Sequence, residues 1–81
     1  MAQWDKFRAK LLGKQADQNI EFATLRNYLI HLGFDEDINA SHHIYGMTGI
    51  SEIIVIQPRR DGKAKAYQVK QVRKIIEDYG L

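Results

Sequence analysis

Residues 39–45 read Asn-Ala-Ser-His-His-Ile-Tyr. We interpret the last five as a β-strand, and a strand turns successive side chains to opposite faces. His42 therefore shares one face with Ile44, whereas His43 shares the other face with Tyr45. One imidazole is expected to point outward while its neighbour packs or finds an internal partner. Because histidine changes protonation between about pH 5 and 8, an outward ring here is a candidate for proton transfer.

The segments that flank this strand complete a sheet. Phe34–Asn39 is a short acidic strand candidate, and Ile50–Gln57 carries a β-branched run typical of a central or well-covered strand. Gly46–Gly49 has turn chemistry between the second and third strands, and Pro58 ends the third. Because the links are short, the three strands are expected to form an antiparallel meander.

Apolar residues at three- and four-residue steps predict three helices. These are expected over Trp4–Leu12, Glu21–Leu32 and Ala66–Tyr79, each followed by a glycine that can end it. Helices and strands that do not alternate indicate an α+β domain, with the last two helices on one face of the sheet and the other face open. The length of 81 residues suits a single domain, in which residues 1–20 form an N-terminal helix and connection and residues 21–81 form the core.

The composition and pattern of the sequence exclude several kinds of functional site and indicate a cellular location. The chain has no cysteine, which excludes disulfides, thiolate nucleophiles and zinc-finger sites. No apolar run approaches the roughly 20 residues that span a bilayer, and the first residues lack a signal-peptide pattern, so a cytoplasmic location without a membrane partner is expected. His42 and His43 cannot chelate one ion together, and Asp35 and Asp37 lack a third ligand. No metal is expected, and without a glycine-rich phosphate loop no cofactor is expected either.

Positive charge is concentrated in the last third of the chain. Seven of the twelve Lys and Arg residues lie between positions 59 and 74, and only Asp61 opposes them: Arg59, Arg60, Lys63, Lys65, Lys70, Arg73 and Lys74. The final helix thus begins among lysines, which its dipole disfavours, although Arg73–Glu77 and Lys74–Asp78 pairs are expected to recover part of that loss. A basic helix N-terminus suits a phosphate group.

This charge pattern supports polyanion binding. The candidate RNA-binding residues are Arg59, Arg60, Lys63, Lys65 and Lys70. The alternative is that the loop and the helix face are simply solvated.

One outward histidine beside a basic surface is sufficient for one class of reaction. RNA carries its own nucleophile, the 2′-hydroxyl group, so cleavage needs only a base for that hydroxyl, an acid for the leaving oxygen and cations around the phosphorane. A histidine with an ordinary pKa of about 6.5 can serve as either the acid or the base. Ser41 and His42 do not form a nucleophile–base pair, because adjacent side chains of a strand diverge.

The pattern resembles that of the HicA mRNA interferases, toxins of bacterial and archaeal toxin–antitoxin pairs. The resemblance covers about residues 22–81, and its matching pieces are Leu29–Phe34, Ala40–Tyr45, Val69–Ile76 and the closing Gly80-Leu81. The family motif is Gly-Ser-His followed after two residues by an aromatic. Here Ala40 stands in place of the glycine, and the N-terminal helix is an addition to the family core.

The resemblance implies a role for each residue of the motif. His42 would be the catalytic acid or base and Tyr45 the motif's aromatic, with Ser41 and His43 as further supporting residues. It also implies a fold like that of the double-stranded RNA-binding domain and metal-independent cleavage of mRNA, which inhibits translation. A HicB-type antitoxin protein would cover the active face and neutralise the toxin.

Two other functions stay open on the sequence alone. One is a non-catalytic RNA-binding module of the same fold. The other is a small interaction domain whose basic surface meets an acidic protein.

Overall fold

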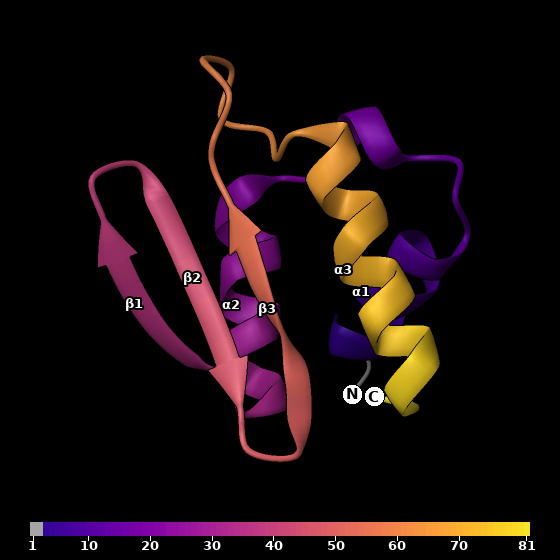
Figure 1. Cartoon of the computed structure of the whole chain (residues 1–81). Helices are drawn as coiled ribbons and strands as arrows, with labels where there is room; N and C mark the ends of the chain where they lie inside the picture. Colours follow the sequence, from indigo (N-terminus) through magenta and orange to yellow (C-terminus); the bar gives the residue numbers. More distant parts are fainter. Residues whose placement is uncertain (1–2) are drawn as a thin grey trace.

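A computed structural model describes residues 3–81 (Figure 1). The elements in chain order are α1 (Gln3–Leu12), a short 3₁₀ helix η1 (Asp17–Asn19), α2 (Phe22–Leu32), β1 (Asp35–Asn39), β2 (His42–Met47), β3 (Ile50–Ile56) and α3 (Ala66–Tyr79). The strands form one antiparallel sheet in the order β1-β2-β3, so the predicted meander is confirmed. The chain is a small α+β domain, as its sequence pattern indicates.

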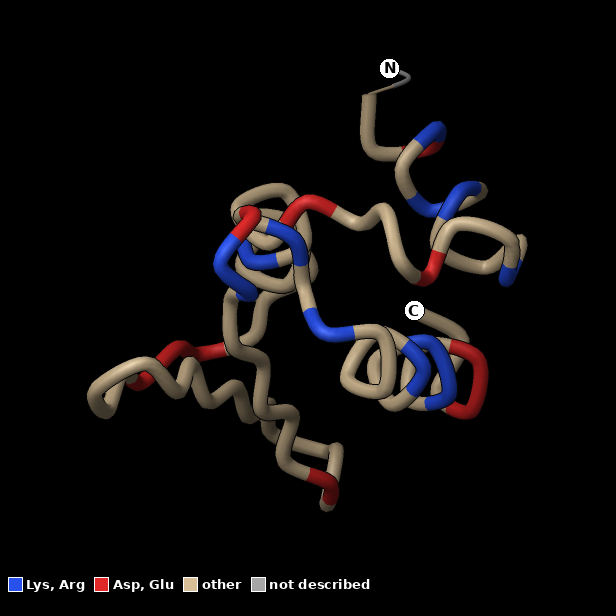
Figure 2. Tube along the Cα trace, turned by 90° about the horizontal axis from the view of Figure 1, so that it is seen from above, with Lys and Arg blue, Asp and Glu red and all other residues tan. Residues whose placement is uncertain are grey.

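The sheet has one covered face and one open face. Helices α2 and α3 pack on one side, and among residues 3–81 no helix lies over the other (Figure 1; Figure 2). Tyr45, Ile54 and Ile56 point to the covered side and have no exposed surface. Their neighbour Ile53 points to the open side and is 52% exposed. The alternation expected for a half-buried sheet therefore holds.

Helix α1 packs on the same core as the rest of the fold. Phe7 and Leu11 are buried in one hydrophobic cluster with residues of α2, β3 and α3. Trp4 packs beside them, with its ring 5.4 Å from that of Tyr28 and stacked 5.3 Å from that of His31. The apolar stripe of this helix therefore serves the core.

The turn between β2 and β3 is shorter than predicted. Strand β2 continues through Met47, and only Thr48 and Gly49 form the turn, with a φ of 94° at Gly49. Met47 packs against the hydrophobic core, and an irregularity in the pairing lies between Tyr45 and Met47. Burial of the Met47 side chain thus outweighs the local turn preference of the preceding Gly46.

Arg73 differs from its predicted pairing with Glu77. Its guanidinium group is buried and donates to both carboxylate oxygens of Asp17, at 2.7 and 3.1 Å, and to the carbonyl oxygen of Leu11 at 3.2 Å. A bidentate pair with a fixed carboxylate is stronger than a solvated pair along one helix face, which explains the preference. The predicted pair of Lys74 with Asp78 is present at 2.9 Å.

The hairpin between β1 and β2 is tight, and Ala40 is its first turn residue. Ala40 has a φ of 56°, in the left-handed region. That conformation costs a residue with a Cβ atom about 1–2 kcal/mol, whereas glycine adopts it freely. Alanine is therefore tolerated with strain at this turn position, which glycine would occupy without it.

This strain predicts that Ala40→Gly stabilises the protein. The gain should be about 0.5–1 kcal/mol, because glycine also loses more conformational freedom on folding. Urea denaturation of the two proteins measures the difference. A decrease in the free energy of unfolding would show that the turn is not strained.

The helix ends agree only in part with the sequence pattern. Gly33 and Gly80 adopt left-handed conformations and end α2 and α3 as predicted, with φ values of 106° and 65°. After α1 the left-handed residue is Lys14, not Gly13.

Nowhere in residues 3–81 does a helix combine the length and apolarity needed to cross a bilayer.

Candidate active site at one end of the sheet

His42 is the first residue of β2 and lies at the end of the sheet where β3 finishes. Its side chain is exposed and points to the open face, together with Ile44. Since His43 pairs with Ile56, the next residue of the third strand's chain, Gln57, lies opposite His42. On the other side, His42 pairs with Asn39 of β1. The predicted division of the two histidines between opposite faces is confirmed.

A chain of side-chain hydrogen bonds lies at the same end of the sheet as His42. The side-chain nitrogen of Gln57, Nε2, donates to the hydroxyl of Ser41 at 3.4 Å. The side-chain oxygen of Gln57, Oε1, accepts from Lys65 Nζ and from Gln68 Nε2, each at 3.3 Å. The backbone N–H of Gln57 donates to Gln68 Oε1 at 2.7 Å. We call Ser41, Gln57, Lys65 and Gln68 the Gln57 bridge.

The Gln57 bridge joins three elements at one point. Ser41 lies in the turn before β2, not in the strand as predicted, and Lys65 is the residue that precedes the first turn of α3. Gln68 is buried, which fixes the inner end of the bridge. The bridge therefore brings a hydroxyl, a carboxamide and an ammonium group together at the end of the sheet where β2 begins with His42.

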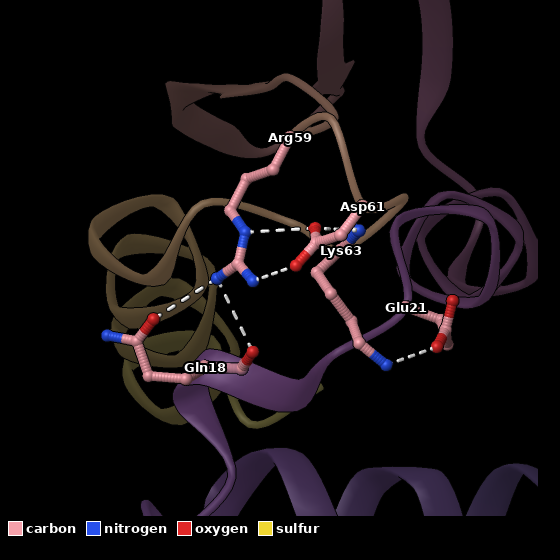
Figure 3. A network of polar contacts seen from close by, with 5 residues as sticks. All are labelled: Gln18, Glu21, Arg59, Asp61 and Lys63. Carbon is pink, nitrogen blue, oxygen red and sulfur yellow. Dashed lines mark hydrogen bonds and ion pairs between the residues drawn. The ribbon is translucent and has the colours of Figure 1, made fainter.

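In the basic loop after β3, residues 59–65, two of the cations form hydrogen bonds with neighbouring side chains (Figure 3). Arg59 forms a bidentate pair with Asp61 and donates to Gln18 Oε1 at 3.1 Å. Lys63 donates to Glu21 at 2.5 Å. Glu21 is the first residue of the helix that the sequence predicts, but it lies just before α2, where it meets the loop.

Backbone hydrogen bonds also attach this loop to the start of α2. The N–H of Phe22 donates to the carbonyl oxygen of Gly62 at 3.0 Å, and the N–H of Ala64 donates to the carbonyl oxygen of Ile20 at 2.8 Å. Two of the candidate RNA-binding cations, Arg59 and Lys63, thus help to hold the loop in place. Their positive charge is offset in part by Asp61 and Glu21.

The remaining candidate cations differ in position. Arg60 and Lys70 are exposed and take part in none of the ion pairs among residues 3–81. Lys70 lies on the side of α3 near η1. There, hydrogen bonds from Arg73 lower the pKa of Asp17 against the effect of burial, and the charge of Lys70 adds to this lowering. Lys65 is the cation that the structure brings next to the His42 end of the sheet.

The strands themselves carry no Lys or Arg, so the cations lie on the helices and on the connecting loops (Figure 2). The open face near β1 is acidic instead, with the exposed carboxylates of Asp35 and Asp37. A polyanion would therefore meet favourable charge at the end of the sheet, near Lys65 and Arg60. It would meet unfavourable charge across β1.

The residues on the inner side of β2 meet a carboxylate that sequence reasoning missed. Glu36 accepts from Tyr45 Oη at 2.6 Å and from Arg26 at 2.6 and 2.8 Å, and its Oε2 lies 3.4 Å from His43 Nδ1. The rings of His43 and Phe22 also pack in a T-shaped arrangement, with the ring centres 4.8 Å apart. We call Arg26, Glu36, His43 and Tyr45 the Glu36 cluster.

The electrostatics of the Glu36 cluster follow from these contacts. Hydrogen bonds from Arg26, Tyr45 and His43 lower the pKa of Glu36 to about 2, although burial opposes them. Burial and the adjacent carboxylate raise the pKa of the Tyr45 hydroxyl. His43 and Tyr45 thus hold β2 against β1 and α2, immediately behind His42.

One hollow of about 300 Å³ lies between β3 and α3 within the described residues. It is lined by Glu52, Ile53, Lys74 and their neighbours, toward the start of β3, and His42 does not line it. Among residues 3–81, no group of three or more His, Cys, Asp or Glu side chains is arranged to hold a metal ion. The side chain of His42 is exposed on the open face, so its site lies on the surface of the domain.

Three comparisons with known proteins place the chain in no group. No family model, no curated protein and no solved structure matches it.

Proposed function

We propose that this protein is a metal-independent endoribonuclease of the HicA type. The observation that carries the proposal is the exposed imidazole of His42 at the same end of the sheet as the Gln57 bridge. A proton-transfer group, a cation and hydrogen-bonding groups then occupy one accessible surface. RNA cleavage by its own 2′-hydroxyl group requires that combination.

The reaction would proceed by internal attack. The 2′-oxygen bonds to the adjacent phosphorus while the bond from phosphorus to the 5′-oxygen breaks. His42 takes the proton of the 2′-hydroxyl group as a base or supplies a proton to the leaving 5′-oxygen as an acid, and the other of these two protons is exchanged with solvent water. The ammonium group of Lys65, which donates to Gln57 Oε1 at 3.3 Å, would offset negative charge on the phosphorane oxygens.

The arrangement of the elements supports a specific fold assignment within this proposal. The segment from α2 to α3 has the order α-β-β-β-α, an antiparallel sheet and both helices on one face. That is the order of the double-stranded RNA-binding domain to which the HicA resemblance points. We include this assignment in the proposal.

A protein antitoxin of the HicB type is the proposed partner. The open face of the sheet beside His42 carries the half-exposed side chain of Ile53 and the partly buried Ile44 and Val55. A partner on this face would also cover His42. In this proposal, mRNA is the substrate, and cleavage inhibits translation in the absence of the partner.

The proposal is tested by incubating the purified protein with single-stranded RNA in EDTA. We expect cleavage, because the nucleophile is part of the substrate and the site uses no metal ion. The matched control is the same sequence with 2′-O-methyl groups, which should bind and stay intact. RNA that is bound with salt-dependent affinity but never cut would favour the non-catalytic RNA-binding module instead.

A further inference from the structure

Tyr67 is an aromatic residue of α3 with an unusual exposure. It is the second residue of the helix, and 64% of its surface is exposed, which is the largest value among the exposed large hydrophobic residues of the described chain. The other tyrosine on this helix, Tyr79, is 38% exposed, and its hydroxyl group donates to Glu52. The ring of Tyr67 thus has a free face that the fold does not use.

Tyr67 lies beside the Gln57 bridge, so its exposed ring is near the candidate active site. Its hydroxyl oxygen lies 3.4 Å from Gln68 Nε2, and Gln68 belongs to the Gln57 bridge. The same bridge leads to the hydroxyl of Ser41, the residue before His42. Lys65, two residues before Tyr67, is attached to the bridge as well. A free aromatic ring, an ammonium group and the exposed imidazole therefore gather at one end of the sheet.

We propose that Tyr67 is a stacking platform for an unpaired RNA base next to the phosphate that His42 and Lys65 contact. The inference rests on the proposed function and deepens it, because it assigns the residue that would hold an unpaired base of the RNA substrate. Aromatic side chains stack on bases of any sequence, and only an unstacked base offers its face. A duplex keeps those faces covered, so a ring in this place favours single strands.

The inference is tested by RNA binding in a His42→Ala background, in which the RNA stays intact. The probe is a single-stranded decamer RNA at fixed salt. Tyr67→Ala should raise Kd about tenfold, which lies toward the lower end of the range for loss of a stacked ring. Tyr67→Phe keeps the ring and should bind like the parent. Tyr79→Ala, at the far end of the same helix, is the matched control and should also bind like the parent.

An abasic scan of the decamer separates stacking from a general effect of the substitution. One abasic position should weaken binding about tenfold when Tyr67 is present and have no further effect in Tyr67→Ala. An equal Kd for Tyr67→Ala and the parent, or the same loss at every abasic position in both proteins, would overturn the inference. Tighter binding of duplex than of single-stranded RNA would overturn it as well.

The outcomes also separate this inference from the proposed function. If the wild-type protein cuts no RNA but the Tyr67 dependence is found, the enzymatic proposal fails and the stacking site stands. If RNA is cut and Tyr67→Ala binds normally, the stacking site fails alone. Absence of any RNA binding would overturn both.

Discussion

His42→Ala is expected to lower the rate of RNA cleavage by at least about a hundredfold, the smaller end of the range for loss of a general acid or base. The side chain is exposed at the start of β2, so its removal should leave the free energy of unfolding within about 0.5 kcal/mol of the wild-type value. RNA binding should persist, since Lys65 and Arg60 are unchanged. Single-turnover cleavage of a labelled RNA, with the protein in excess, measures the chemical step.

His31→Ala is the matched control for this experiment. His31 is also exposed, but it lies on α2 and stacks on Trp4, away from the Gln57 bridge. Its substitution should leave the cleavage rate unchanged. In cells, expression of the wild-type protein should arrest growth and expression of His42→Ala should not. Cleavage by His42→Ala at the wild-type rate would remove His42 from the mechanism.

Glu36→Gln is expected to lower the free energy of unfolding by about 2 kcal/mol at pH 7. The carboxylate accepts hydrogen bonds from Arg26 and from the buried Tyr45, and a neutral amide replaces these charge-assisted bonds with weaker ones. Chemical denaturation measures the loss. Asp37→Asn is the matched control, because its side chain is exposed on the other face of the same strand and should matter little.

The effect of Glu36 should depend on pH in a defined direction. Its pKa is lowered to about 2 in the folded protein, so the ionised form is favoured by folding. The stabilisation is complete above the ordinary pKa of about 4.3 and disappears as the pH falls toward 2. The difference between wild type and Glu36→Gln should therefore shrink between about pH 5 and pH 2. A difference that stays constant over this range would show that ionisation of Glu36 contributes nothing to stability.

The sequence was most informative where periodicity and a single buried face act together. The alternation in β2 predicts correctly that His42 and His43 lie on opposite faces and that His43 shares its face with Tyr45, and the structure shows that His42 is the outward one. The sequence was less informative where contacts with a distant segment decide the end of a strand or the partner of a side chain. Met47 extends β2 because it packs on the core, and Arg73 turns from Glu77 to Asp17 because a 3₁₀ turn far away in the chain lies beside it.

The candidate site could be predicted only in part for the same reason. Gln57 and Gln68 give no local signal, since their role depends on the end of β3 meeting the start of α3. The inward position of Glu36, in contrast, could have been predicted from the sequence. Glu36 is two residues after the buried Phe34 and so points inward, where a carboxylate requires a cation or other donors. That reasoning predicts a partner but cannot identify Arg26.

The central claim is that the 2′-hydroxyl group of the substrate attacks with the help of His42. Mass spectrometry of the RNA fragments formed in EDTA tests it most directly. The account predicts that every new 3′ end carries a 2′,3′-cyclic phosphate and every new 5′ end carries a free hydroxyl. Fragments with a 3′-hydroxyl and a 5′-phosphate would mean that water attacked instead, and would contradict it.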